Sequence, residues 1–276
     1  MKYTVIKHAP QFPDSYIEAY VHDAHAELQI GKRKAIIVCP GGGYSFLSER
    51  EAEPVALQYF AAGLNVFVLR YSILEKAANY APLIEACLAI KYLRDHQNEL
   101  YVNPKYVFIT GFSAGGHLAA WTGTMWHISE VAAHIGGSEQ SVCKPSATLP
   151  CYPVITSKPE IRRGGSISAL NGMKENDEAG MARFSLETFV DEKTSPAFLW
   201  HTANDALAPV MNSILYAEAL CKNNIPFELH IYPNGPHGLS ICNKETSRGQ
   251  AALDNPYVAQ WLPQAIRWVT ECPFEK

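Results

Sequence analysis

A serine flanked by glycines is the residue of this chain best suited to covalent chemistry. Residues 111–115 read Gly-Phe-Ser-Ala-Gly, directly after the apolar run 106–109 and before a stretch with helical spacing. Between a strand and a helix, a G-x-S-x-G sequence forms a turn too tight for side chains at its flanking positions, so the serine hydroxyl projects above the sheet edge. The pattern predicts Ser113 as a nucleophile, although glycine-flanked serines also occur in ordinary tight loops.

An acid and a histidine follow Ser113 in the order that such a turn requires. A serine hydroxyl is a weak nucleophile and needs a general base, which a carboxylate in turn orients. The strand-like run 196–201 leads into Asp205, and the strand-like run 227–232 leads into His237. We expect His237 to accept the serine proton and to return it to the leaving group, while Asp205 holds the imidazole in the correct tautomer.

Other residues compete for these roles. Asp177 and Asp191 also lie between the serine and the histidine, but neither directly follows a strong strand pattern. Taken singly, Asp205 could be a helix N-cap and the histidine a surface turn residue, so the assignment depends on the complete set occurring in the right order. Among the remaining histidines, we expect His201 to be a packed or hydrogen-bonded core residue and His117 to belong to the helix after the serine.

A run of three glycines offers the donors that a developing oxyanion requires. Gly41, Gly42 and Gly43 follow the apolar run 35–38, and backbone without side chains lets N–H groups approach a substrate oxygen closely. We expect Gly42 and Gly43 to donate from this loop, and Ala114 to donate from the position after the nucleophile. An ordinary flexible loop is the alternative interpretation.

Alternating strands and helices are the elements that would position these residues. In chain order the expected elements are strands at 4–6, 16–21 and 35–38, a helix around 51–62, a strand at 65–69, a helix around 81–97, a strand at 106–109, a helix at 114–125, strands at 148–155 and 197–201, a helix at 210–222, a strand at 227–232 and a helix near 256–270. The first two strands are expected to pair antiparallel at one edge. The remainder predicts a single α/β domain over 1–276 with a doubly wound, mostly parallel sheet.

One long segment, 156–195, interrupts this alternation. We expect it to form a small, partly helical cap over the site, because long connections in compact domains are usually functional or disordered. A surface excursion without substrate contact is the alternative. Tyr44, after the glycines, and Tyr152, leaving the strand at 148–155, would then line the pocket, with packing as the alternative for each.

Four motifs resemble the α/β-hydrolase superfamily, and within it the carboxylesterases related to bacterial feruloyl and acetylxylan esterases. They are Pro40-Gly-Gly-Gly-Tyr44 with Ser45-Phe-Leu-Ser48 behind it, Gly111-Phe-Ser-Ala-Gly-Gly-His117, His201-Thr-Ala-Asn-Asp205 and Tyr232-Pro-Asn-Gly-Pro-His-Gly238. The resemblance implies an α/β-hydrolase fold and an ester hydrolase with the triad and oxyanion roles assigned above. It also implies short acyl esters or acetylated sugars as substrates. Cys39-Pro40 stands where the hormone-sensitive-lipase branch usually has histidine, which favours the sugar-ester branch.

Two other function classes share parts of this pattern. Peptidases of the prolyl-oligopeptidase type have the same triad order, but they generally carry a large propeller domain for which this chain has no room. A non-catalytic binding module with a hydrolase fold typically lacks the serine or the histidine, and both are present here.

Composition agrees with a soluble enzyme. The 276 residues include 47% hydrophobic residues, enough for a large core, and the net charge of −4 argues against nucleic acid as a partner. The chain has neither a continuous apolar signal region at its N-terminus nor an apolar stretch long enough to span a membrane, which predicts a cytoplasmic protein. Seven cysteines without C-x-x-C spacing favour small buried residues over a metal site or disulfides. We expect no cofactor, a small-molecule ester as partner and, as a hypothesis, a homodimer.

Overall fold

The computed structural model describes residues 1–24, 26–162, 165–174 and 176–274. Its strands form one sheet of eight in the order β1-β2-β4-β3-β5-β6-β7-β8. The strands are β1 (Lys2–Ile6), β2 (Tyr16–Val21), β3 (Arg33–Cys39), β4 (Asn65–Arg70), β5 (Val102–Phe112), β6 (Thr148–Cys151), β7 (Ala197–Thr202) and β8 (Phe227–Tyr232). β2 pairs antiparallel with both β1 and β4, and every other pair is parallel. The predicted mostly parallel sheet with an antiparallel N-terminal edge is confirmed.

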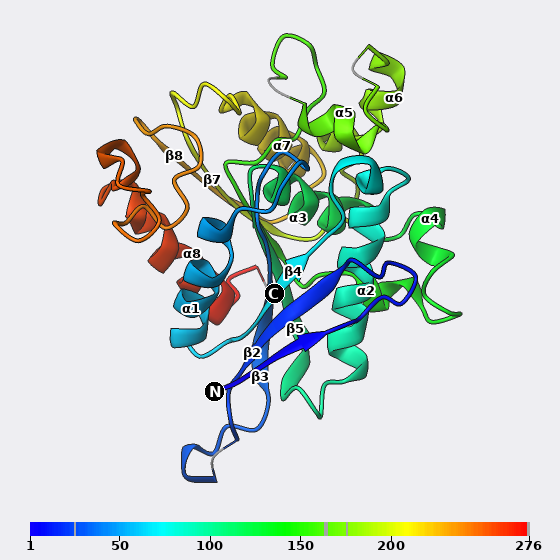
Figure 1. Ribbon diagram of the computed structural model, residues 1–276, viewed down its shortest axis with the longest axis vertical. Helices are drawn as coiled ribbons and strands as arrows, with labels where there is room; N and C mark the ends of the chain where they lie inside the picture. The colour runs from blue at the N-terminus through cyan, green and yellow to red at the C-terminus, as the bar shows by residue number, and fades with distance from the viewer. Residues whose placement is uncertain (25, 163–164, 175, 275–276) are drawn as a thin grey trace.

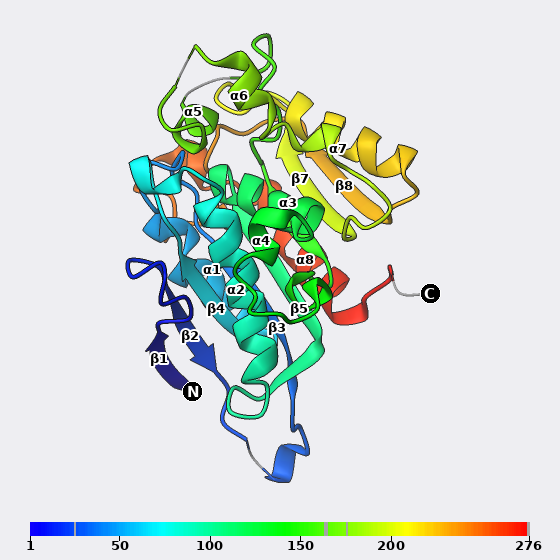
Figure 2. The same cartoon turned by 90° about the vertical axis from the view of Figure 1, so that its right-hand side faces the viewer.

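Helices cover both faces of the sheet. They are α1 (Glu53–Ala61), α2 (Ala81–Asp95), α3 (Ala114–Met125), α4 (Ser129–Ala132), α5 (Ser166–Leu170), α6 (Glu178–Ala182), α7 (Met211–Lys222) and α8 (Trp261–Glu271). Short 3-10 helices lie at Ala26–Leu28, Glu49–Glu51, Leu74–Ala77, Gln140–Cys143, Leu186–Thr188, Ala251–Leu253 and Val258–Gln260. α1 and α8 lie on one side of the sheet, whereas α2, α3 and α4 lie on the other (Figures 1 and 2).

Alternation along the central strands divides the core into two layers. In β3, Ile37 belongs to the cluster that includes α2, α3 and α7, whereas Ile36 and Val38 belong to the cluster that includes α1 and α8. All three side chains are buried. Successive side chains of a strand point to opposite faces, so a parallel strand covered by helices on both sides needs a continuous apolar run.

The segment 156–195 lies at one end of the molecule, where α5 and α6 stand apart from the main helix layers (Figures 1 and 2). Residues 163, 164 and 175 of this segment lie outside the described residues. Asp177 is the N-cap residue before α6, and its side chain accepts a hydrogen bond from the backbone N–H of Gly180 at 2.9 Å. This aspartate therefore caps a helix, as aspartates commonly do.

Several predicted boundaries were wrong. The strand expected at 148–155 ends at Cys151, because Tyr152 adopts a φ of 35° and turns the chain. The strand expected at 106–109 extends over Val102–Phe112, and the helix expected near 256–270 begins only at Trp261.

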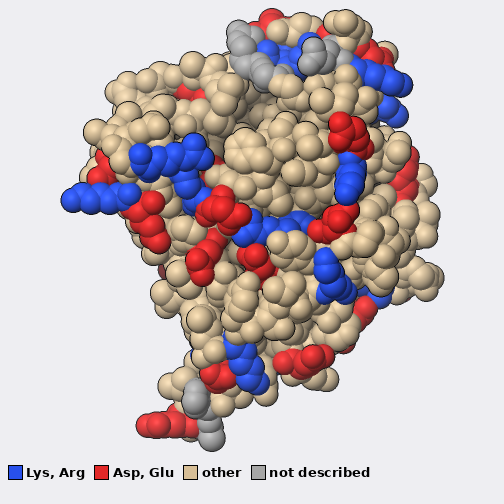
Figure 3. Space-filling view, viewed as in Figure 1, with Lys and Arg blue, Asp and Glu red and all other residues tan. Residues whose placement is uncertain are grey.

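The surface carries charges of both signs. On the face shown in Figure 3, acidic and basic side chains are interspersed. Within the described ranges, no helix is long and apolar enough to cross a membrane.

Candidate active site

Ser113 occupies the turn between a strand and a helix. β5 ends at Phe112 and α3 begins at Ala114, so the serine alone makes the reversal, with φ of 54° and ψ of −115°. Such a conformation costs a non-glycine residue on the order of 1–3 kcal/mol and needs support from its surroundings. The Ser113 N–H donates to the carbonyl oxygen of Cys151 at 3.0 Å, and its own carbonyl accepts from the N–H of His117 at 2.9 Å.

The glycines on either side permit this turn. A Cβ atom at Gly111 would lie 2.0 Å from the carbonyl oxygen of Gly115, and one at Gly115 would lie 2.1 Å from the carbonyl oxygen of Cys39. Real Cβ atoms essentially never approach backbone this closely. The first turn of α3 therefore lies directly on the ends of β3 and β5, and this packing directs the serine side chain away from the sheet.

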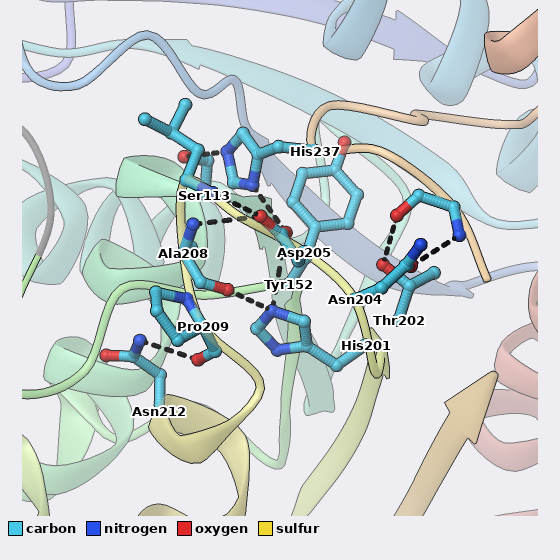
Figure 4. A network of polar contacts seen from close by, with 12 residues as sticks. Ser113, Tyr152, His201, Thr202, Asn204, Asp205, Ala208, Pro209, Asn212 and His237 are labelled. Carbon is cyan, nitrogen blue, oxygen red and sulfur yellow. Dashed lines mark hydrogen bonds and ion pairs between the residues drawn. The ribbon is translucent and has the colours of Figure 1, made fainter. Parts of the chain in front are cut away.

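The three residues expected to form a triad lie in one hydrogen-bonded row (Figure 4). Asp205 follows β7 and His237 follows β8, so both come from the carboxyl ends of parallel strands. His237 Nε2 lies 2.8 Å from Ser113 Oγ, and His237 Nδ1 lies 2.7 Å from Asp205 Oδ2. The carboxylate accepts the proton of Nδ1, which leaves Nε2 of the neutral imidazole free to accept the serine proton.

The Asp205 side chain is fully buried and held by several donors. Its Oδ1 accepts from the backbone N–H groups of Leu207 and Ala208, each at 2.9 Å. Burial acts to raise the pKa of this carboxyl, but hydrogen bonds from His201 and His237, the charge of His237 and the backbone donor outweigh it and hold the pKa well below its usual range. Asp205 is therefore a permanent anion beside the imidazole.

The competing aspartates lie elsewhere. Asp177 caps α6, as described above. Asp191 accepts from the backbone N–H of Lys193 at 2.9 Å, and its Oδ2 lies 3.4 Å from Nε2 of His127. Both carboxylates have other partners, and only Asp205 bonds to His237 among the described residues.

His201 is a buried, hydrogen-bonded residue and His117, also buried, belongs to the helix after the serine, as expected. His201 Nε2 donates to the carbonyl oxygen of Ala208 at 2.7 Å and lies 3.5 Å from Asp205 Oδ2, so it braces the loop that carries the acid. His117 belongs to α3, and burial lowers its pKa to about 4. Its neutral ring donates from Nε2 to the carbonyl oxygen of Phe184 at 3.0 Å.

The expectation that Tyr44 and Tyr152 line the pocket was wrong. Both rings are buried, and both residues adopt positive φ, 58° for Tyr44 and 35° for Tyr152, which turns their side chains into the core. The Tyr44 hydroxyl bonds to His117 Nδ1 at 2.9 Å. The Tyr152 hydroxyl donates to Glu51 Oε1 at 2.6 Å and accepts from the backbone N–H of Ser240 at 2.9 Å. Packing, the alternative interpretation, describes both.

A cavity of about 390 Å³ opens over the serine. Ser113 and His237 line it together with Gly42 and Gly43. Ser166, at the start of α5, contributes to the same lining, so part of the segment 156–195 borders the cavity.

The glycine loop presents unused donors to this cavity. Gly42 and Gly43 adopt φ of 132° and 64°, and the carbonyl oxygen of Gly42 accepts from the N–H groups of Ser45 and Phe46. The backbone N–H groups of Gly42, Gly43 and Ala114 donate no hydrogen bond within the described part of the chain. Available backbone donors beside a serine are what an oxyanion hole requires.

A buried glutamate that sequence reasoning missed links this loop to the histidine loop. Glu51 is 4% exposed, and its Oε2 accepts from the N–H of Gly41 at 2.9 Å while its Oε1 accepts from Tyr152. The tyrosine hydroxyl extends this series of hydrogen bonds to the backbone N–H of Ser240, three residues after His237. In the sequence Glu51 reads only as an acidic residue ahead of a helix, and nothing local indicates its burial.

The described residues hold no group of three or more histidine, cysteine, aspartate or glutamate side chains that could bind a metal ion. All seven cysteines are free thiols, and only Cys221 is exposed. Their prediction as mostly buried residues is confirmed.

The fold and the position of the serine define an α/β-hydrolase. The chain belongs to the BD-FAE family, whose profile matches residues 25–220. It is 31% identical over 212 residues to an acetylxylan esterase of Xylanibacter ruminicola, an alignment that covers 75% of this chain and 41% of that protein. The chain spans less than half the length of the curated relatives it matches.

Two solved structures are similar over nearly the whole chain. MGS-M1, an α/β-hydrolase enzyme from a Medee basin deep-sea metagenome library, is 34% identical with a TM-score of 0.79, covering 98% of this chain and 97% of its own. An acetyl ester-xyloside bifunctional hydrolase from Caldicellulosiruptor lactoaceticus is also 34% identical, with a TM-score of 0.77, covering 95% of this chain and 89% of its own.

Proposed function

We propose that this protein is a serine hydrolase that cleaves short acyl esters, with acetylated sugars as the substrate class. The observation that carries the proposal is the row of hydrogen bonds from Ser113 through His237 to Asp205, which opens into a cavity with unused backbone donors. Membership of the BD-FAE family and the similarity to an acetylxylan esterase and to an acetyl ester-xyloside hydrolase favour acetyl esters of sugars.

The reaction would proceed through an acyl-enzyme. As Ser113 Oγ attacks the ester carbonyl carbon, its proton passes to His237 Nε2, and Asp205 stabilises the resulting imidazolium. The N–H groups of Gly42, Gly43 and Ala114 would bind the negatively charged oxygen of the tetrahedral intermediate. Collapse of the intermediate breaks the bond to the alcohol, which leaves with the proton from Nε2. A water molecule then repeats the sequence on the acyl-enzyme and releases the carboxylic acid.

The partner of this protein is accordingly a small-molecule ester. A peptidase of the prolyl-oligopeptidase type and a non-catalytic binding module are the competing proposals. Cytoplasmic residence and a homodimer stay predictions.

The deciding experiment compares substrate classes with one protein preparation. We expect turnover of para-nitrophenyl acetate and of acetylated xylo-oligosaccharides, falling rates as the acyl chain of the aryl ester lengthens, and no cleavage of a dipeptide arylamide. Ser113→Ala should abolish ester hydrolysis while the circular dichroism spectrum and thermal unfolding stay near those of the wild type. A serine-directed phosphonate should label Ser113 alone. Arylamide cleavage at rates comparable with ester cleavage, or label on another residue, would refute the proposal.

A further inference from the structure

Arg248 places an unpaired positive charge at the catalytic cavity. It is exposed and lines the same cavity as Ser113 and His237. Its guanidinium makes no hydrogen bond or ion pair with any residue that the structure describes. By contrast, Arg70 pairs with two glutamates, and Arg94 donates to backbone carbonyls.

The loop that carries Arg248 is held in place by buried neighbours. Thr246 and Ser247 are buried, and the Nε atom of Arg50 donates to the carbonyl oxygen of Thr246. Ser247 Oγ accepts from the N–H of Gly249 at 3.2 Å. Between these anchors Arg248 adopts a φ of 54°, a left-handed conformation that costs a non-glycine residue roughly 1–2 kcal/mol. The structure thus fixes the backbone from which this side chain extends.

The other charged residues of the cavity wall, Arg50 and Glu51, already have hydrogen-bond partners. Arg50 donates to two backbone carbonyls, one of them that of Gly238 at 2.6 Å. Glu51 accepts from the N–H of Gly41 and from the hydroxyl of Tyr152. Among the described residues of this wall, Arg248 is therefore the charged group without any hydrogen bond or ion pair, in a protein whose net charge is −4.

We propose that Arg248 binds a carboxylate carried by the ester substrate, so that the enzyme prefers anionic esters over neutral ones of the same shape. The planar guanidinium fork matches a carboxylate in two parallel hydrogen bonds. The carboxylate belongs either to the alcohol side, as in a sugar joined to a uronic acid, or to the acyl side, as in a half-ester of a dicarboxylic acid. This inference rests on the proposed ester hydrolysis at Ser113.

The test uses pairs of esters that differ only in charge. On the alcohol side the pair is para-acetoxybenzoate and its neutral methyl ester, and on the acyl side it is para-nitrophenyl hemisuccinate and its neutral methyl ester. The variants are Arg248→Gln and, as a matched control for the loss of one positive charge, Arg267→Gln. Arg267 is exposed on α8, is absent from the cavity wall, and likewise has no described side-chain partner. The value of kcat/KM is measured for each ester at low and at high ionic strength.

We expect Arg248→Gln to lower kcat/KM by about 5- to 30-fold for the anionic member of one pair, and by less than about twofold for its neutral partner. The pair that responds identifies the side that carries the carboxylate. High salt should shrink the difference, because the charges are partly exposed. Arg267→Gln should leave kcat/KM unchanged for the charged and for the neutral esters.

An equal loss on charged and neutral esters, or no loss on either charged ester, would overturn the inference while leaving ester hydrolysis intact. If the wild type cleaves none of these esters, the proposed function fails instead. Calorimetry then provides the same comparison without turnover, by measuring the binding of para-hydroxybenzoate and of succinate to Ser113→Ala and to the double variant Ser113→Ala/Arg248→Gln. If the two proteins bind each ligand with equal affinity, the role of Arg248 is refuted.

Discussion

Replacing Gly42 by alanine tests whether the glycine loop binds the oxyanion. A Cβ atom at Gly42 would lie 2.0 Å from the carbonyl oxygen and 2.7 Å from the carbonyl carbon of Phe46. Neither atom can withdraw alone, because the N–H groups of Ser45 and Phe46 both donate to the Gly42 carbonyl, at 3.0 and 3.2 Å. The φ of 132° at this position is also one that alanine rarely adopts. The substitution must therefore displace the loop.

Gly43→Ala is the matched control. Among the described residues, a Cβ atom there meets only Ser166 Oγ, at 3.5 Å, which is ordinary van der Waals contact. The φ of 64° lies in the left-handed region that alanine reaches at roughly 1–2 kcal/mol. We expect Gly43→Ala to lower the free energy of unfolding by about that amount and to keep its N–H group in position. Gly42→Ala should lose at least one donor, and loss of one oxyanion donor in a protease costs about 2.7–4 kcal/mol of barrier, or roughly 100- to 1,000-fold in kcat.

The assay is the kcat and KM of each variant for para-nitrophenyl acetate, together with thermal unfolding. We expect Gly42→Ala to lower kcat far more than it raises KM, because the interaction strengthens only as the carbonyl oxygen gains charge. A crystal structure of the variant separates loop displacement from general misfolding. Should folded Gly42→Ala protein retain kcat within a few-fold of the wild type, segment 40–44 is a connecting loop and the donors lie elsewhere.

Three further predictions concern the charged groups. Asp205→Asn should lower kcat by about 10⁴-fold on the precedent of the chymotrypsin-type triad, whereas Asp191→Asn should change it little; the reverse result in ester assays would refute the assignment of the acid. Tyr152→Phe leaves Glu51 Oε1 without its donor, so kcat should fall by roughly tenfold at unchanged KM and stability by about 1–3 kcal/mol; a changed KM alone would contradict this positioning role. Burial raises the pKa of Glu85 to about 7. Its neutral form therefore stabilises the fold below about pH 4.5, and this contribution, on the order of 3 kcal/mol, is lost as the pH rises through 7. Denaturant unfolding of Glu85→Gln should lack this loss, and parallel curves of unfolding free energy against pH for the two proteins would contradict it.

The sequence predicted the residues whose signal is local. Ser113 stands between glycines after an apolar strand, and Asp205 and His237 each follow a strand of their own, so motif and chain order were enough to bring the three together. The same holds for the central strands, because a parallel strand buried on both faces must be a continuous apolar run. The boundaries were less accurate, since the end of β6 depends on the backbone conformation of the single residue Tyr152.

Residues whose environment is built by distant parts of the chain could not be found in this way. Glu51 is buried because a hydroxyl 101 positions away and the N–H of Gly41 satisfy its oxygens. The loop of Arg248 is held beside the cavity by residues distant in sequence, since Arg50 donates to the carbonyl oxygen of Thr246, two residues before Arg248. A local pattern contains no trace of either partner, so such residues appear in the sequence only as ordinary surface charges.

The wrong placement of the Tyr44 and Tyr152 side chains and the correct placement of Ser113 on a sharp turn have the same physical origin. Ser113 and Tyr152 directly follow β5 and β6, Tyr44 lies in the loop after β3, and all three residues adopt positive φ, at 54°, 35° and 58°. The glycine-flanked serine predicted a sharp reversal at the carboxyl end of a strand, and this reversal directs Ser113 Oγ toward His237. At the two tyrosines the reversal has no such sequence signature, and it directs each ring inward, where Tyr152 connects Glu51 to the histidine loop. The direction of a side chain after a strand thus depends on the backbone conformation of one residue, which decides whether that side chain meets the substrate or supports the residues that do.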